Sequence, residues 1–342
     1  MPISRNTQVW LYAFLIFFAH TVFAENTDVT RLDPVLDRII ASDARVEKVA
    51  GGFKFTEGPV WFNDGQFLVF SDIPDNRIYR WDAATGSVSV YLDKSGFTGD
   101  DPTGIGREVN EGSGIFYNIG SNGITKDADG RIVFNAMGDR AIVRLEQDGR
   151  RTVLATHFQG KRLNSGNDIV YHSSGRLYFT DPPSGLRGGD EDPDKQLPYS
   201  GVFMLKDGEL HLLTSDVLHP NGLAFSSDEK FLFVNDNRAR QIYRFRVAQD
   251  GTLSDQQFFV DMKDDPATGN PDGMKVDTEG NMYAAGPGGI WIISPEGKHL
   301  GTIHFPERAS NMTFGGDDAK TLYVTARTGI YRVRINIPGI RP

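Results

Sequence analysis

The sequence predicts an all-β fold, a six-bladed β-propeller with a short N-terminal helix. Two observations support this prediction. A phrase made of a polar residue, a short apolar strand, a Gly-containing turn and a second strand recurs six times in the chain of 342 residues. Long helical patterns are scarce, whereas turn-forming Gly is abundant. Repeats of roughly 40–50 residues that each hold several strands are typical of propeller blades.

The first 24 residues differ from the rest of the chain. A basic start, MPISR, is followed by the apolar run WLYAFLIFF, which falls short of the ~20 residues that a membrane-spanning helix needs. Small residues then precede a cleavage point after Ala24. This order predicts a secretory signal peptide over residues 1–24, with an uncleaved membrane anchor as the alternative. We therefore expect a periplasmic or secreted protein without membrane contact after cleavage.

Composition limits the chemistry and the partners. The chain has no Cys, which excludes disulfides, thiolate metal sites and cysteine nucleophiles. Its formal net charge of −9 argues against nucleic acid as the main partner. We therefore expect a small-molecule partner, and the oligomeric state stays open.

Residues 25–50 form an N-terminal extension before the repeats. The stretch LDPVLDRIIASDARVEKVA, residues 32–50, predicts a helix because Asp33 and Pro34 suit its first turn and apolar residues follow at helical spacing. We expect this helix to pack on the outside of a single propeller domain over residues 51–336, because no linker interrupts that range.

Each of the six repeats begins with an oxygen-bearing side chain, which we call its leading residue. The leading residues are Glu57, Asn122, Asn167, Asn221, Asp272 and Asn311, at separations of 65, 45, 54, 51 and 39 residues. The long spacings locate insertions over residues 97–114 and 182–201, which are rich in Gly, Pro and Asp and therefore predict loops. Loops of this length in a compact domain are usually functional or disordered.

The leading residues are expected to converge. The first strand of each propeller blade lines the central channel, so its leading residue should lie at one mouth, and the second strand returns to the same mouth. On the second strands, the side chains that should reach this mouth are Asp72, Asp139, Asp181 and Asp236. The 182–201 insertion should cover it as a lid. Asn-Gly and Asp-Gly pairs are also common in hairpin turns, which is the alternative interpretation, but Glu57 is no turn former.

Converging oxygen ligands favour a hard cation when Cys and an HExxH pattern are absent. Ca²⁺ is the first choice, and Mg²⁺, Mn²⁺ or Zn²⁺ are alternatives. Glu57 and Asp272 supply two negative charges among neutral amides. Without a cation, carboxylates crowded in this way would raise each other's pKa. The sequence therefore predicts a divalent metal site at this mouth.

Several stretches resemble a known family. FTEGPVW, GKRLNSGNDIVYHSSGRLYFTDPP, LHPNGLAFSSDEKFLFV and PDGMKVDTEGNMYAAGPGGIWIISPEGK are similar to the gluconolactonase and senescence marker protein (regucalcin-like) family, with bacterial gluconolactonases closest. The resemblance implies one catalytic divalent metal, commonly calcium. The implied metal ligands are Glu57, Asn167, Asn221 and Asp272.

The same resemblance implies hydrolysis of a sugar lactone to its aldonic acid. The cation would polarise the carbonyl, and Asp272 would activate water or act as the nucleophile, with Asp168, Asp236 and His219 as further candidates. The candidate substrate-binding residues are Asn122, Asn164, Asp168 and Asp236.

Two departures from the family pattern bear on the pocket. Members often carry a His where this chain has Met137, which favours a less polar substrate, and many have Pro where this chain has Gly166. The alternatives to a sugar lactonase are a hydrolase of non-sugar lactones or organophosphates on the same site and a non-enzymatic ligand- or calcium-binding propeller. The charges of Glu57 and Asp272 disfavour the last alternative.

Overall fold

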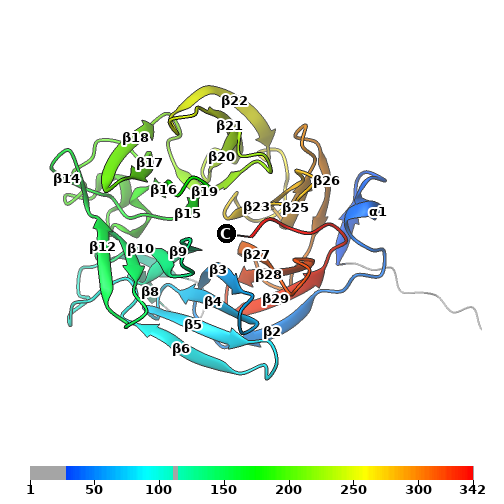
Figure 1. Cartoon of the computed structure of the whole chain (residues 1–342), viewed down its shortest axis with the longest axis horizontal. Helices are drawn as coiled ribbons and strands as arrows, with labels where there is room; N and C mark the ends of the chain where they lie inside the picture. The colour runs from blue at the N-terminus through cyan, green and yellow to red at the C-terminus, as the bar shows by residue number, and fades with distance from the viewer. Residues whose placement is uncertain (1–27, 111–114, 342) are drawn as a thin grey trace, which may run out of the picture.

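The computed structural model describes residues 28–110 and 115–341. Within these residues, six antiparallel sheets surround a central channel like the blades of a propeller, and there is almost no helix (Figure 1). The predicted all-β, six-bladed fold is confirmed. The predicted signal peptide, residues 1–24, lies outside the described residues, and within them no helix is long and apolar enough to span a membrane.

Each of the first four blades consists of four strands that follow one another along the described chain. The first strand of each blade lines the channel and the next three lie progressively farther out (Figure 1). Blade one holds β3 (Thr56–Phe62), β4 (Phe67–Asp72), β5 (Arg77–Asp82) and β6 (Val88–Asp93). Blade two holds β9 (Ser121–Lys126), β10 (Ile132–Ala136), β11 (Ala141–Leu145) and β12 (Arg151–Ala155). Blade three holds β15 (Ile169–Tyr171), β16 (Leu177–Asp181), β17 (Gly201–Lys206) and β18 (Glu209–Thr214), and blade four holds β19 (Pro220–Phe225), β20 (Phe231–Asp236), β21 (Gln241–Val247) and β22 (Leu253–Asp261).

The last two blades take their outermost strands from the N-terminal part of the chain. Blade five holds β23 (Met274–Val276), β24 (Met282–Gly286), β25 (Gly289–Ile293) and β26 (His299–Ile303), and β1 (Val29–Arg31) pairs with β26. Blade six holds β27 (Ala309–Gly315), β28 (Thr321–Ala326) and β29 (Gly329–Arg334), and β2 (Glu47–Gly51) pairs with β29. Strand β2 therefore completes the last blade and closes the ring.

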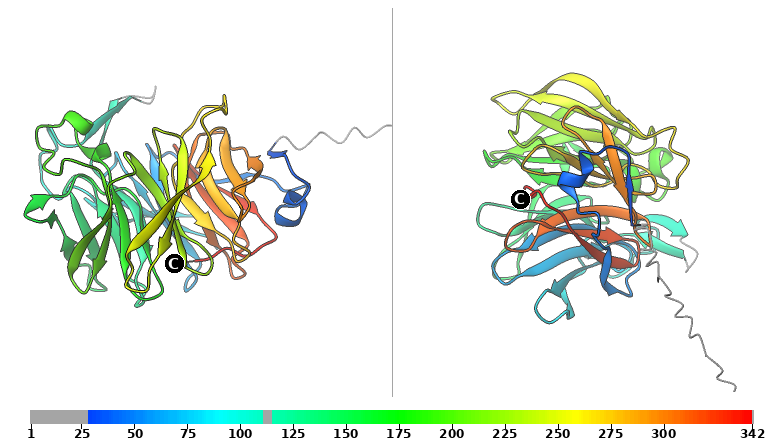
Figure 2. Two further views of the ribbon diagram at one scale, coloured as in Figure 1. Left: turned by 90° about the horizontal axis from the view of Figure 1, so that it is seen from above. Right: turned by 90° about the vertical axis from the view of Figure 1, so that its right-hand side faces the viewer.

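The N-terminal helix is shorter than the sequence predicts. Helix α1 covers Leu36–Ile39, whereas the helical pattern runs over residues 32–50. The end of that pattern forms β2, so the N-terminal extension contributes to the propeller before residue 51. The end of this stretch does not form a helix, because only an extended chain can pair with β29. Tertiary contacts of this kind override the local helical propensity. Helix α1 lies on the outside of the ring (Figure 2), and its buried Leu36 and Ile39 belong to the apolar cluster between blades five and six.

Apolar side chains fill the interfaces between neighbouring blades. The core of the described residues falls into six clusters, one for each interface around the ring. Because alternate residues of a strand face opposite sides, every blade contributes to the cluster on each side of it. Between blades six and one, Trp61 stacks on Tyr323 with ring centroids 4.9 Å apart and an interplanar angle of 8°. Aromatic packing therefore supports the closure that β2 provides.

The two insertions lie together at one end of the channel (Figure 2). The sequence predicts a loop over residues 97–114, but part of it forms a hairpin, β7 (Arg107–Asn110) with β8 (Ile115–Asn118). The 182–201 insertion contains two short 3-10 helices, η1 (Pro183–Gly185) and η2 (Gly189–Glu191). A further small hairpin, β13 (His157–Phe158) with β14 (Lys161–Arg162), joins blades two and three.

The second insertion is fixed to blade four by an acidic residue. Asp190 in η2 lies 3.3 Å from Nε2 of His219 and 2.7 Å from Nη1 of Arg238. His219 is thus a neighbour of the insertion, and its pKa is lowered, mainly by burial. The middle of the insertion is therefore held against the propeller by Asp190, in addition to the two points where the insertion joins its blade.

Replacement of Trp61 tests the packing at the closure of the ring. Trp61 is 1% exposed, and its Nε1 has no hydrogen-bond partner among the described residues. Trp61→Ala should lower the free energy of unfolding by about 3–5 kcal/mol, because it removes the ring and leaves a cavity. Trp61→Phe keeps an aromatic ring and loses no hydrogen bond, so its loss should be clearly smaller. Urea unfolding measures both, with the exposed Val153→Ala as control; equal losses for Ala and Phe would contradict the role of ring packing.

Candidate active site at one mouth of the channel

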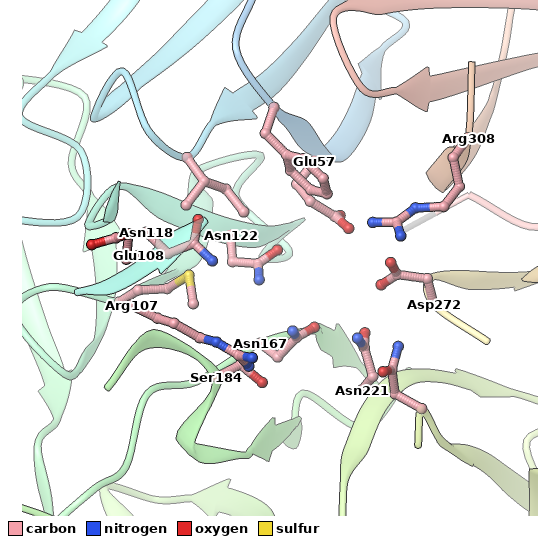
Figure 3. Close-up of a pocket in the computed structure, with 14 residues that line it drawn as sticks. Glu57, Arg107, Glu108, Asn118, Asn122, Asn167, Ser184, Asn221, Asp272 and Arg308 are labelled. Carbon is pink, nitrogen blue, oxygen red and sulfur yellow. The ribbon is translucent and has the colours of Figure 1, made fainter. Parts of the chain in front are cut away.

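Five of the six leading residues line a single pocket of about 360 Å³ (Figure 3). These five are Glu57, Asn122, Asn167, Asn221 and Asp272. The sixth, Asn311, is buried behind Glu57 and donates a hydrogen bond from Nδ2 to Glu57 Oε2 at 3.1 Å. A pocket of this size lies within the range of small-molecule sites. The repeat therefore brings together the side chains that share one position in each blade.

Irregularities at the starts of the inner strands turn the leading side chains toward the channel. The pairing register shifts after Glu57 in β3 and around Asn221 in β19. Such a bulge places an extra residue on one strand and re-aims the neighbouring side chains. Asn167 and Asp272 instead lie just before their strands, β15 and β23, and their backbone N–H groups donate to Thr180 at 2.9 Å and to Ala285 at 3.2 Å on the second strands of the same blades.

Each of the first four blades holds the leading residue of the next blade through its second strand. A side chain near the end of this strand donates a hydrogen bond to the backbone carbonyl of the neighbouring leading residue. These bonds run from Ser71 to Asn122 at 2.8 Å, from Asn135 to Asn167 at 2.8 Å, from Thr180 to Asn221 at 2.7 Å and from Asn235 to Asp272 at 2.6 Å. Sequence analysis missed these donors. A signal was present, because Ser71, Thr180 and Asn235 each directly precede the Asp that ends the strand.

Two glycines that follow leading residues allow neighbouring blades to approach closely. A Cβ at Gly222 would lie 2.0 Å from the backbone O of Asp272, and one at Gly58 would lie 2.2 Å from the backbone O of Asn122. Gly58 also has a φ of +53°, a conformation that favours Gly. The alternative interpretation as hairpin turns is wrong for the Asn-Gly pairs that begin at Asn122 and Asn221, because both lie within inner strands.

The aspartates at the ends of second strands support the segments that lead into the pocket. Asp72 accepts hydrogen bonds at 2.9 and 3.1 Å from the two backbone N–H groups three and two residues before Glu57. Asp236 accepts two at 3.2 Å from the backbone just before β19, and Asp181 accepts the N–H of Asn164 at 2.8 Å. Each of these carboxylates therefore accepts hydrogen bonds from the backbone, although Oδ1 of Asp181 has no partner among the described residues, and none of the three lines the pocket.

Of the four predicted substrate-binding residues, Asn122 lines the pocket and the other three do not. Asn164 is fully buried, and its Nδ2 donates to two backbone carbonyls, both at 2.9 Å. Asp168 is also buried and accepts a backbone N–H at 2.9 Å. Asp236 supports the segment before β19. The structure thus places these three side chains around the site and not in its lining.

The two acidic leading residues face the same space in the pocket (Figure 3). Burial and the neighbouring charge of Asp272 raise the pKa of Glu57 well above its usual value. Burial likewise raises the pKa of Asp272 to about 7, although the guanidinium group of Arg308 beside it favours the charged form. Two carboxylates in this setting are costly to ionise together unless a cation lies between them.

Neutral oxygens of the pocket also lack partners. The Oδ1 atoms of Asn122 and Asn221 are buried without a hydrogen bond to any described residue. Buried polar atoms normally have a partner, and a hard cation such as Ca²⁺ prefers carboxylate and amide oxygens. The residues present therefore fit such a cation. Across residues 28–110 and 115–341 no three His, Cys, Asp or Glu side chains are grouped to hold a metal, so amide oxygens would have to complete the ligand set.

The pocket also contains residues that sequence analysis did not single out. Arg308 lies three residues before Asn311, and its guanidinium group points toward Glu57 and Asp272 (Figure 3). The remaining lining residues are Phe55, Ile73, Arg107, Glu108, Asn118, Met137, Ser184 and Asn237. Arg107 and Glu108 come from the first insertion, Asn118 ends the hairpin that begins in it, and Ser184 comes from the second insertion, so the length of the insertions was the available signal. Met137, which sequence analysis did note, lies in the apolar part of the lining.

The fold and the pocket together define a six-bladed β-propeller with a small, polar, acidic site at one mouth of its channel. Residues 55–328 match the SMP-30/Gluconolactonase/LRE-like region. This match covers most of the chain, and the chain belongs to this family. The resemblance seen in the sequence is therefore confirmed.

Relatives with known names cover nearly the whole chain. A gluconolactonase of Zymomonas mobilis is 37% identical over 316 residues, which cover 90% of this chain and 85% of that protein. A pentonolactonase of Haloferax volcanii is 28% identical over 278 residues, covering 80% and 81%. The solved structure of a gluconolactonase from Xanthomonas campestris has a TM-score of 0.75 at 30% identity and covers 90% of this chain and 95% of that one.

Substitution of Gly222 tests the close approach of blades four and five. Gly222→Ala should destabilise the protein by about 1–3 kcal/mol or more, because the added methyl group meets backbone that cannot rotate away. It should also displace Asp272 and reduce any activity of the pocket. Gly51→Ala is the matched control, since its Cβ would first meet the flexible end of Lys48 at 2.8 Å. Thermal unfolding measures both variants, and equal stabilities would contradict the clash.

Proposed function

We propose that this protein is a divalent-cation-dependent lactonase that hydrolyses a sugar lactone to its aldonic acid. The observation that carries the proposal is the pairing of two acidic leading residues with the buried Oδ1 atom of Asn221, which has no partner among the described residues. The names of the relatives from Zymomonas mobilis and Haloferax volcanii support the reaction class. We further propose that the protein acts in the periplasm or outside the cell, because of its signal-like N-terminus.

Glu57, Asn167, Asn221 and Asp272 would hold the cation, with Ca²⁺ as the first choice. When bound, the cation would polarise the lactone carbonyl and stabilise the negative charge that develops on its oxygen. Glu57 is oriented for this role, because Oε2 accepts hydrogen bonds from the backbone N–H of Gly58 at 2.8 Å and from Asn311. These bonds fix the carboxylate in one position before a ligand arrives.

Asp272 is the proposed base. It would accept a proton from a water molecule whose oxygen bonds to the carbonyl carbon of the lactone. The ring C–O bond then breaks, and the ring oxygen takes up a proton to become the hydroxyl group of the open acid. Asn235 holds the backbone carbonyl of Asp272, and the Asp272 carboxylate lies beside Arg308. The proposed base is therefore fixed relative to Glu57.

The rest of the lining would bind and orient the lactone. The amide side chains of Asn118, Asn122 and Asn237 offer donors and acceptors for sugar hydroxyl groups. The lining also includes the apolar side chains of Phe55, Ile73 and Met137, which favour, as a second candidate function, hydrolysis of a less polar lactone or an organophosphate. A pH-stat assay with gluconolactone, a non-sugar lactone and an organophosphate separates these two candidates.

Removal of the cation should abolish hydrolysis and lower stability. Saturation at 100 times Kd stabilises a protein by about 2.7 kcal/mol, so added Ca²⁺ should raise the melting temperature. Glu57→Gln should lose this rise, yet in chelator it should be at least as stable as the wild type, because it removes a buried carboxylate. The exposed Glu209→Gln is the control. Activity that survives EDTA, or an equal Ca²⁺ response in Glu57→Gln, would contradict the proposed cation site.

Asp272→Asn tests the assignment of the base. The variant should lose at least about 100-fold in kcat, which corresponds to the usual contribution of general base catalysis. It should remain folded, since the amide has the shape of the carboxylate and removes a buried charge. Asp264→Asn, which changes an exposed residue, should keep full activity. A near-wild-type kcat in Asp272→Asn would refute the assignment.

A further inference from the structure

Two guanidinium groups line the pocket, and their surroundings differ. Arg308 points toward the carboxylates of Glu57 and Asp272, whereas Arg107 extends toward Ser184 on the opposite side of the pocket (Figure 3). The side chain of Arg107 makes no hydrogen bond and no ion pair with the residues that the structure describes, although its backbone pairs with Asn118 in the hairpin. It is therefore a cation that faces the substrate space without a fixed counterion among those residues.

The charge balance of the pocket points the same way. Three carboxylates, those of Glu57, Glu108 and Asp272, line the pocket with two guanidinium groups. A bound divalent cation would leave this lining with a surplus of positive charge. A neutral lactone does not compensate that surplus, whereas a lactone with an anionic group does.

Each of these two residues on the insertion side is next to a glycine that packs closely against the rest of the protein. Gly106, just before Arg107, has a φ of +76°, and a Cβ there would lie 2.6 Å from the backbone O of Asn118. Gly185, just after Ser184, packs so closely that a Cβ would lie 2.0 Å from Oγ of Ser165. These contacts fix the backbone on which Arg107 and Ser184 are carried.

The two insertions also contact each other. The guanidinium group of Arg187, from the second insertion, lies 6.0 Å from the ring centroid of Tyr117 in the hairpin of the first insertion. This distance is at the limit of a cation–π contact. Arg107 and Ser184 therefore belong to one continuous wall of the pocket, opposite Glu57 and Asp272.

We propose that the pocket selects a lactone that carries an anionic group, such as a carboxylate, and that Arg107 and Ser184 bind this group. The proposal rests on the lactonase function proposed above. The guanidinium fork matches a carboxylate with two parallel hydrogen bonds, and the Ser184 hydroxyl adds a donor. The lactone carbonyl then lies toward Glu57 and Asp272, and the anionic group lies on the insertion side.

A matched pair of substrates tests the proposal. D-glucaro-1,4-lactone and D-glucono-1,4-lactone share a ring and differ in a carboxylate that replaces a hydroxymethyl group. The wild type should have a kcat/KM about tenfold or more higher for the anionic lactone, because charge-assisted hydrogen bonds are the stronger ones. Arg107→Gln should remove most of this preference, mainly through KM, since the contact binds ground state and transition state alike.

Two further variants sharpen the test. Arg107→Lys keeps the charge but loses the fork, so it should retain part of the preference. Arg150→Gln, which removes an exposed guanidinium group in the turn after β11, should keep all of it. Added salt should reduce the preference of the wild type, because the pair is open to solvent.

The outcomes separate this proposal from the lactonase function. Hydrolysis of both lactones without preference for the anionic one would overturn the inference and leave the lactonase function intact. If the protein hydrolyses neither lactone, the result contradicts the lactonase function for this pair of substrates. Calorimetry then decides the inference independently of turnover: D-glucuronate, which carries a carboxylate where D-glucose has a hydroxymethyl group, should bind the wild type at least about tenfold more tightly than D-glucose, and Arg107→Gln should remove the difference. Equal affinities in the wild type would overturn it.

Discussion

The site depends on hydrogen bonds that cross from each of the first four blades to the next. A side chain on the second strand of one blade holds the backbone carbonyl of the neighbouring leading residue at 2.6–2.8 Å. The blades must therefore be packed in their final positions before the pocket has its geometry. Gly222 and Gly58 permit that approach, since any side chain there would hold the blades apart. The scaffold and the site are in this sense one structure.

The two buried carboxylates of the pocket are costly for the stability of the fold. Burial and mutual charge raise the pKa of Glu57, and burial raises that of Asp272 to about 7. Arg308 offsets part of this cost, and Asn311 donates to Glu57. A bound cation would offset the remaining cost, because a positive charge close to the two carboxylates favours their charged forms.

The repeat made the blades and the leading residues predictable, because the same phrase recurs wherever an inner strand begins. The sequence also predicted that Asp236 returns to the same end of its blade. It did not predict that backbone N–H groups donate hydrogen bonds to the Asp236 carboxylate. Arg107 and Ser184 reach the pocket through insertions whose fold the repeat does not encode. The prediction of a helix over residues 32–50 was too long for a similar reason. The end of this stretch forms β2, whose partner strand β29 lies at the other end of the chain, so the local sequence does not reveal the pairing.

That partnership has a consequence for how the protein is made. Glu47 and Arg332, which pair across β2 and β29, are 285 positions apart. A ribosome releases the N-terminal strand long before its partner exists, so a growing chain carries five blades and an open edge. Such non-local pairing folds slowly, and exposed edges invite wrong partners. The pairing of β2 with β29 therefore requires that β29 has been synthesised, and a chain truncated before β29 cannot complete the ring.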